Sequence, residues 1–225
     1  MNCHFRSWRT DKEQTGALVS SSASTNNQRC TSDRVPDANR RLTAGIVSFS
    51  LMGFIWGHSM PTDDLPVLFD QWALNRERTL ALLQTIRNLP DPAAALGWRP
   101  GPGRAHIGWQ LAHIAITEEL FATERFLGTT PDFPDLGPRF KGGSTPDDQI
   151  PSADDLTHWL EHSRQHLLAT VKSLSNEQLQ AVPPALQARN LTARKALSIL
   201  TWHEPHHQGQ AHITLNLFKA AHGLS

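Results

Sequence analysis

Apolar positions divide the chain into an irregular first part and a helical second part. Residues 1–41 are rich in Ser, Thr, Asn, Gln and Arg and show almost no periodic apolar positions, which is the composition of a disordered segment. Beyond Met60, apolar residues recur every three or four positions, the period of amphipathic α-helices. We therefore expect residues 1–60 to form a disordered N-terminal extension and residues 61–225 to form one domain.

Four amphipathic stretches of the domain each predict one long helix. Their expected ranges are residues 63–89, 106–127, 152–174 and 192–221. Ser152 and Thr192 are the expected N-caps of the last two, and Asp155 stands three residues after Ser152 in a capping-box-like position. No segment reads convincingly as a strand, so the pattern predicts an all-α domain built as a four-helix bundle.

Two connections between these helices are rich in Pro and Gly. Residues 90–104 are expected to form a loop, and residues 128–151 form a longer connection that could cross the bundle. Structureless loops of that length inside a compact domain are often functional. Arg139 and Lys141 are the only cations of the longer connection and could meet an anionic ligand, with solvated surface charge as the alternative.

An uncharged, largely apolar run at residues 42–58 allows three interpretations. It is slightly short for a membrane-spanning helix and contains three glycines. It resembles the apolar core of a signal sequence behind Arg40 and Arg41, but the leader would be long and no small-x-small cleavage site follows. The third interpretation is that Met60 is the natural start. We favour the third because the domain pattern begins immediately after Met60.

Charge and cysteine content narrow the function classes. Residues 1–60 carry a net charge of +3 and residues 61–225 a net charge of −3, without a Lys/Arg cluster in the domain. Such a domain is a poor candidate for nucleic-acid binding, and we expect no membrane association. Cys3 and Cys30 both precede the domain, which therefore has no disulfide, no thiolate nucleophile and no cysteine-type zinc site, as suits a reducing cytoplasm.

Three histidines are candidate metal ligands. His203 and His207 are four residues apart, which places both imidazoles on one face of a helix, and that face is the one expected to look inward. His113 lies on the inward stripe of the second helix, where an unpaired imidazole would be costly to bury. Alternatively, these histidines are hydrogen-bonded members of a polar seam in the core. If they share one ion, their ligating nitrogens should lie within about 3–4 Å of one another.

The other histidines of the domain are less suited to this role. His206 should point about 100° away from the inward face, and His212 is interpreted as an ordinary helix histidine. A stripe of three histidines lies mostly off the apolar face of the third helix and is interpreted as solvated; its members are His158, His162 and His166.

Two further positions near these helices carry structural expectations. Pro205 removes a backbone donor and clashes with the carbonyl of Thr201, so we predict a kink or locally broken hydrogen bonding at Thr201–Pro205. Asn75, near the stripe of the first helix, is interpreted as a hydrogen-bonded core amide.

Two motifs identify a resemblance to a known family. They are Gly-Trp-Gln-Leu-Ala-His at residues 108–113 and His-Glu-Pro-His-His-Gln-Gly-Gln at residues 203–210. Over about residues 62–222 the domain resembles the DinB-like family of metal-dependent bundle proteins, which includes thiol-dependent S-transferases and maleylpyruvate isomerase-like relatives. The resemblance implies an up-down-down-up helix order. It also implies that His113, His203 and His207 hold a divalent ion, zinc or nickel, with positions left open for water or substrate.

The resemblance leaves two functions open. The first is a metal-dependent transferase or hydrolase that acts on a small molecule with a low-molecular-weight thiol as cosubstrate; any thiolate must arrive with the substrate because the domain has no cysteine. The second is a non-catalytic metal- or ligand-binding bundle, a stress-related homodimer. The sequence identifies no catalytic acid or base beside the ligands. Candidate hydrogen-bond partners for the ligating imidazoles are Glu118, Glu204, Gln208 and Gln210.

Overall fold

The computed structural model describes residues 64–224, and every regular element in this range is a helix. The long helices are α1 (Asp64–Arg87), α3 (Ile107–Leu120), α5 (Ala153–Ser173) and α7 (Ala193–Ala221). The short elements are α2 (Pro92–Gly97), the π-helical turn η1 (Phe121–Arg125), α4 (Gly137–Phe140), α6 (Asn176–Gln180) and the 3₁₀ turn η2 (Pro184–Arg189). The all-α prediction is therefore confirmed for the described part of the chain.

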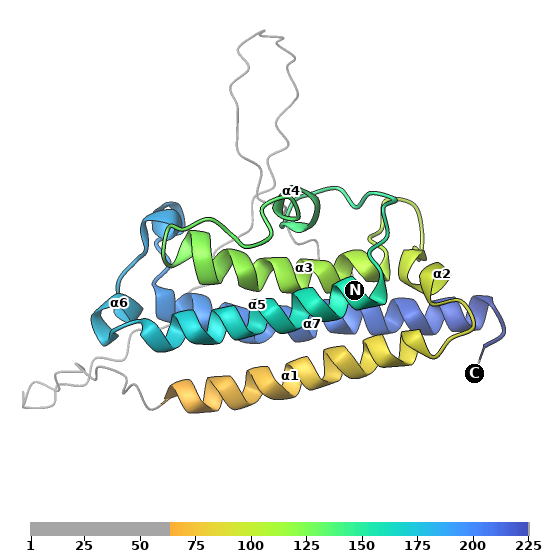
Figure 1. The fold of residues 1–225 in the computed structure, drawn as a ribbon, viewed down its shortest axis with the longest axis horizontal. Coiled ribbons are helices and arrows are strands. Elements are labelled where there is room, and N and C mark those ends of the chain that lie inside the picture. Colours follow the sequence, from red (N-terminus) through yellow and green to blue (C-terminus); the bar gives the residue numbers. More distant parts are fainter. Residues whose placement is uncertain (1–63, 225) are drawn as a thin grey trace, which may run out of the picture. The chain divides into compact units, whose positions relative to one another are not determined.

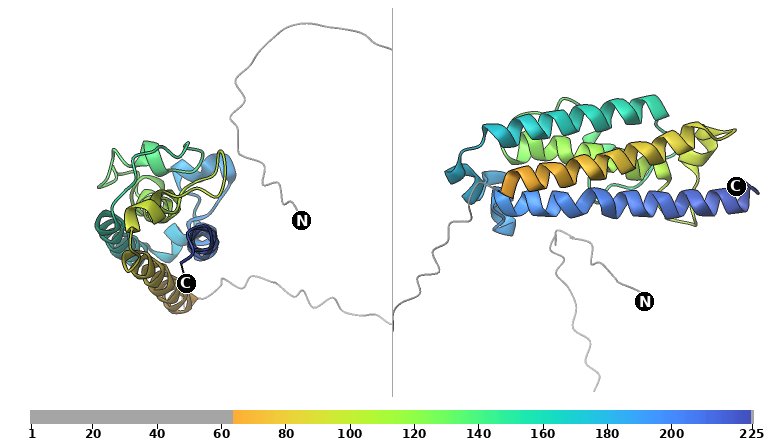
Figure 2. Two further views of the ribbon diagram at one scale, coloured as in Figure 1. Left: turned by 90° about the vertical axis from the view of Figure 1, so that its right-hand side faces the viewer. Right: turned by 90° about the horizontal axis from the view of Figure 1, so that it is seen from below.

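The four long helices lie side by side along the length of the domain (Figure 1). α3 packs against α5 and α7, and α1 packs against α7 and α5. In Figure 1, α1 and α7 run from left to right, whereas α3 and α5 run from right to left. α3 and α5 can share a direction because the connection between them, which includes α4, returns along the outer side of α3 (Figures 1 and 2).

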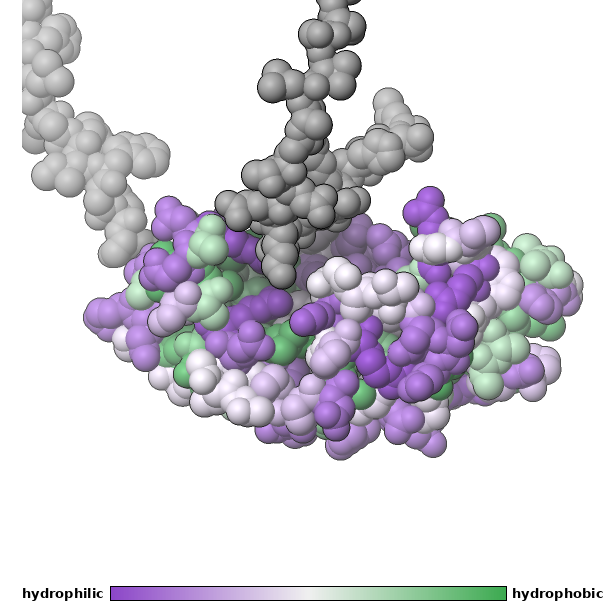
Figure 3. All heavy atoms as spheres, turned by 90° about the horizontal axis from the view of Figure 1, so that it is seen from above, coloured by the Kyte–Doolittle hydropathy of each residue, from purple (hydrophilic) through white to green (hydrophobic). Residues whose placement is uncertain are grey.

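This connection explains why α3 is the most deeply placed helix. Every residue of α3 is buried, including its polar ones. An amphipathic helix on a bundle surface would bury one stripe only, so the long connection must cover the side of α3 that the other helices leave open. Seen from that side, the surface of the described residues is mainly hydrophilic, with small apolar groups between (Figure 3). A polar side chain on α3 can consequently be held away from bulk water.

The ends of the long helices follow the predicted capping chemistry. Ser152 and Asp155 form a reciprocal capping box at the start of α5, and Thr192 accepts a hydrogen bond from the backbone of Lys195 at the start of α7. His106 caps α3, because its Nδ1 accepts from the backbone N–H of Trp109 at 3.0 Å. The second predicted helix therefore starts one residue later than expected, with the histidine as its cap.

The predicted helix boundaries and loops need three corrections. The second predicted helix does not continue as an α-helix to residue 127; it changes to the π-helical turn η1 after Leu120. The loop predicted at residues 90–104 contains α2, whose start is specified by the Asp91 N-cap and by Pro92 in the first turn. The 128–151 connection contains α4, and α6 and η2 separate α5 from α7. Helices this short have no apolar period to detect, which is why the pattern missed them.

An ionic cluster crosses the buried centre of the domain, with one charged residue from each long helix. The four residues are Arg76 of α1, Glu118 of α3, Arg164 of α5 and Glu204 of α7. Each arginine pairs with both carboxylates, and all four side chains are less than a tenth exposed. Buried charges are tolerated where they are paired in this way, and this pairing connects all four long helices.

α7 remains helical through Pro205, and the predicted alternative of locally broken hydrogen bonding at Thr201–Pro205 is confirmed. Pro205 cannot donate to the carbonyl of Thr201, and Asn75 of α1 donates to that carbonyl instead, with Nδ2 3.2 Å from the oxygen. Trp72 Nε1 donates to the Thr201 hydroxyl at 2.8 Å. The interpretation of Asn75 as a core amide is confirmed, and the backbone bond lost at the proline is replaced from the neighbouring helix.

Several sequence predictions concern residues that the structure does not describe. The N-terminal extension at residues 1–60 and the apolar run at residues 42–58 lie outside residues 64–224. Within residues 64–224, no helix combines the length and the apolar character needed to cross a membrane.

Candidate metal centre

The three predicted ligands meet between α3 and α7. The imidazole rings of His113, His203 and His207 form a triangle with centroid separations of 4.9, 4.5 and 4.6 Å. Nε2 of His113 lies 3.1 Å from Nε2 of His203, and one ligand nitrogen from each ring lies within 4.8 Å of the others. One pair therefore meets the expected separation of 3–4 Å, and the other two pairs lie within 4.8 Å.

Contacts from two sides orient the His113 ring. Its Nδ1 donates to the carbonyl of Phe140, 2.6 Å away, which leaves Nε2 with a lone pair facing His203. Trp109, one turn earlier on α3, stacks on the His113 ring at a centroid distance of 4.7 Å and an interplanar angle of 12°. The indole Nε1 of Trp109 donates to the carbonyl of Arg139, so α4 and the residues around it help to hold both rings.

Gln110 orients the His207 ring, and sequence reasoning missed this role. The Nδ1–H of His207 donates a hydrogen bond to Gln110 Oε1, 2.6 Å away. In this tautomer Nε2 carries no proton, and its lone pair can bind a metal ion. Gln110 stands three residues before His113, on the same side of α3, inside the motif that identified the second helix. That spacing was the signal available in the sequence.

The suggested partners Glu118 and Glu204 have a different role. Both carboxylates belong to the buried ionic cluster with Arg76 and Arg164. Gln210 contacts His206, with Gln210 Nε2 2.9 Å from His206 Nε2. The ligating rings of His113 and His207 are instead held by a backbone carbonyl and by an amide, which fix the tautomer without adding a negative charge.

The histidines of the site are held in the neutral state that metal binding requires. Burial lowers the pKa of His203 to about 3, and the neighbouring His113 contributes. Burial also lowers the pKa of His207 to about 2, with His203 and His113 contributing. The pKa of His113 is lowered by burial as well, against the opposing effect of the Phe140 carbonyl. All three imidazoles are thus neutral near pH 7, so a cation does not have to displace an extra positive charge from any of them.

The remaining histidines of α7 point elsewhere. His206 is exposed and stacks on Trp202 at a centroid distance of 4.4 Å, as expected for a residue off the inward face. His212 is also exposed. Neither belongs to the three-histidine group.

The histidine stripe of α5 does not behave uniformly. His158 is exposed, as predicted, but His162 and His166 are half-buried and contact Asp132 and Glu119. The interpretation of the whole stripe as solvated was therefore wrong for two of its three members. The periodic pattern could not show this, because Asp132 comes from the long connection and reaches α5 only in the folded chain.

The two cations of the long connection have separate environments. Arg139 pairs with Asp147, with Nε 2.9 Å from Oδ2, which accounts for its charge. Lys141 lines a surface pocket of about 250 Å³ together with Arg125 of η1. Arg125 also helps to lower the pKa of His113 and of His203, so one residue of this pocket acts electrostatically on these two histidines.

Comparison with known families is consistent with these observations. A family model described as the DinB superfamily matches residues 71–211, more than half of the 225-residue chain. The chain belongs to the DinB superfamily. The matched range of this DinB superfamily chain contains His113, His203 and His207 and all four residues of the ionic cluster. None of the curated proteins matched the chain.

Proposed function

We propose that this DinB superfamily protein binds one divalent metal ion, zinc or nickel, through Nε2 of His113, His203 and His207. The observation that carries the proposal is the 3.1 Å separation of His113 Nε2 and His203 Nε2. Two nitrogens that share a tetrahedral zinc ion at about 2.0–2.1 Å each lie about 3.3 Å apart. Without metal, only a proton on His203 Nε2 can link these two atoms, and a cation can replace that proton.

The metal proposal is tested by metal content after reconstitution with zinc. Changing any one of His113, His203 and His207 to Ala should remove one equivalent, because two imidazoles alone make a weak site. His206→Ala and His212→Ala are matched controls from the same helix and should retain the parent metal content. If His113→Ala retains it too, the three-histidine site is wrong.

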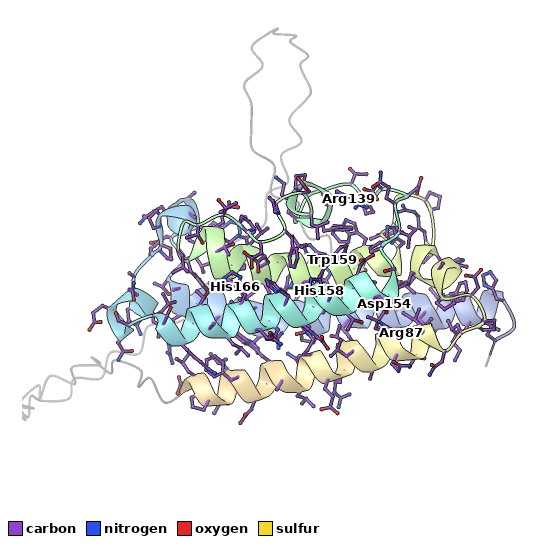
Figure 4. The ribbon with its side chains drawn as sticks, viewed as in Figure 1. Arg87, Arg139, Asp154, His158, Trp159 and His166 are labelled. Atoms are coloured by element: carbon purple, nitrogen blue, oxygen red, sulfur yellow. The ribbon has the colours of Figure 1, made fainter. Side chains whose placement is uncertain are left out.

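The proposed helix order is the up-down-down-up four-helix bundle. It is supported by the opposite directions of α1 and α7 relative to α3 and α5 in Figure 1. The site itself lies where α3 packs against α7, with His113 on α3 and His203 and His207 on α7. Figure 4 shows the side chains of α5 and α4 around this part of the domain, with Arg139 on the outer side of α3.

The proposed reaction is transfer of a small thiol to an electrophile, or hydrolysis of a small molecule. A divalent ion held by three imidazoles keeps an open position and can lower the pKa of a bound water or thiol. The protein's own residues orient the ligands: the Phe140 carbonyl holds His113, and Gln110 holds His207. Arg125 and Lys141 line the nearby pocket and could orient an anionic group of the substrate.

Turnover assays separate this proposal from its alternative, a non-catalytic metal-binding bundle. The alternative is favoured by one observation: the two carboxylates nearest the ligands in sequence are neutralised by arginines and unavailable as general bases. Zinc-loaded protein should consume a low-molecular-weight thiol with a panel of electrophiles, and chelation should abolish the reaction. Stoichiometric zinc binding without any turnover would support the alternative.

A further inference from the structure

We propose a second metal site, formed by Glu119 of α3, Asp132 of the long connection, and His162 and His166 of α5. One ligand atom from each of these four side chains lies within 4.8 Å of the others. The cluster is separate from the three-histidine site, because none of its members belongs to that group and its α5 residues lie on a different helix from His203 and His207. The chemistry would suit zinc or a similar borderline cation.

The donor set is one that zinc prefers. Two imidazoles and two carboxylates provide four ligands of the types found in tetrahedral zinc sites. His162 and His166 are four residues apart on a helix, the same spacing as His203 and His207. In Figure 4, His158 and His166 both project from α5, and His162 lies between them in sequence.

The distances within the cluster fit one ion after small adjustments. His162 Nε2 lies 2.7 Å from Asp132 Oδ2, and His166 Nδ1 lies 3.0 Å from Glu119 Oε2 and 3.6 Å from Asp132 Oδ2. Ligand atoms around a tetrahedral zinc ion are about 3.3 Å apart. These three pairs fall on both sides of this value, and the remaining pairs lie within 4.8 Å.

Glu119 points to a ligand independently of these distances. Glu119 is only 1% exposed, and its only ion-pair partner among residues 64–224 is His166. Its other oxygen accepts from the backbone N–H of Asp132 at 2.9 Å, which orients the carboxylate toward the connection. An arginine or lysine normally accompanies a carboxylate this deeply buried, as the ionic cluster shows for Glu118. A divalent cation would supply the missing positive charge here.

The consequence of such a site is structural. Asp132 belongs to the connection that covers the outer side of α3, whereas Glu119 and the two histidines belong to the packed helices. An ion shared by all four would tie this cover to the bundle. Glu119 lies six residues after His113 on α3 and two residues before η1. An ion bound to Glu119 would therefore stabilise the segment that leads to η1 and Arg125.

The test uses the full chain with the first site removed, so that the two proposals fail separately. A His203→Ala/His207→Ala background should still bind about one zinc equivalent, and cobalt in its place should give the visible absorption of a four-coordinate site. Adding His162→Ala and His166→Ala should abolish both signals. His158→Ala is the matched control, because His158 is exposed on the same helix outside the cluster, and it should change neither.

Glu119→Gln separates a four-ligand site from zinc binding by the histidine pair alone. Gln keeps the size of the side chain and an oxygen for the Asp132 N–H but loses the charge, so zinc affinity should fall at least about tenfold. Unchanged affinity in Glu119→Gln would mean that the histidine pair binds alone, and the proposal would be overturned. It would also be overturned if the background bound no zinc, which would leave a hydrogen-bonded network of histidines and carboxylates.

Discussion

Glu118→Gln is a direct test of the buried ionic cluster, because it removes one charge while preserving the volume of the side chain. The Glu118 carboxylate accepts from Arg76 Nη2 at 2.9 Å and from Arg164 Nε at 3.1 Å. Glu118 is 3% exposed, so water cannot replace the lost charge. In the variant, two buried guanidinium groups share Glu204 as their one remaining carboxylate partner.

The expected destabilisation is large. Leaving a buried charge uncompensated costs about 3–5 kcal/mol. Each 1 kcal/mol shifts the Tm of a domain of this size by about 2–4 °C, so the Tm should fall by roughly 6–20 °C. Urea denaturation followed by circular dichroism should show a lower midpoint with an unchanged slope. Glu161→Gln, an exposed neutralisation on α5, is the control and should change stability by no more than about 0.5 kcal/mol.

The pH dependence of stability provides a second measurement on the same variant. Burial opposes ionisation of Glu118, but Arg76 and Arg164 outweigh it and hold the pKa of Glu118 below its ordinary value of 4.5. The unfolded chain therefore takes up this proton first as the pH falls. The stabilisation from Glu118 is complete above pH 4.5 and is lost as the pH falls toward the lower folded-state pKa. Glu118→Gln should have a flatter stability curve in this acidic range. A loss of less than about 1 kcal/mol, with parallel curves, would refute the reasoning.

Three further predictions follow from other contacts. Asn75→Ala should lower the free energy of unfolding by about 1–3 kcal/mol, because the Thr201 carbonyl loses the donor that replaces the proline N–H. The loss should be smaller in a Pro205→Ala background, where the backbone N–H of residue 205 can donate to that carbonyl. Chemical denaturation of the single and double variants measures both effects. Gln110→Ala should weaken zinc binding by about 10–100-fold, measured by competition with a chelator, because the imidazole it holds would lose its orientation. A chain that begins at Met60 should keep the helical signal and Tm of the full chain, and a markedly lower Tm would show that the extension packs on the domain.

The sequence predicted the long helices because their burial is periodic. α5 has a clear apolar stripe and a Ser152 cap, and both its existence and its start were predicted correctly. The shared inward face of His203 and His207 was predictable because a four-residue spacing on a helix is a local property. His113 was recognisable because it interrupts an otherwise apolar stripe.

The rest depended on contacts between residues far apart in the chain. The ionic cluster joins residues up to 128 positions apart, and no local pattern shows that Arg76 will meet Glu204. The same holds for Asn75, whose partner is a carbonyl 126 residues away. The full burial of α3 was also missed, because it results from the long connection and not from the helix itself. These features could be identified only from the three-dimensional structure, in which residues distant in sequence come into contact.

The ionic cluster and the three-histidine site use the same helix pairing, which gives the cluster a functional consequence. Buried ion pairs contribute little net stability compared with apolar packing, and their better-attested role is to fix register. Glu204 lies between two ligands on α7, and Glu118 lies five residues after His113 on α3. The contacts that align these carboxylates through Arg76 and Arg164 therefore also set the distance between His113 and His203. We expect Glu118→Gln to weaken zinc binding at the three histidines by about 2–30-fold, the range of 0.5–2 kcal/mol seen for coupled positions. The comparison is made with His166→Ala added to both the parent chain and the Glu118→Gln variant, so that zinc binding at the second cluster does not contribute. Equal zinc affinities of the two proteins would show that the register of α3 and α7 does not depend on the buried charges.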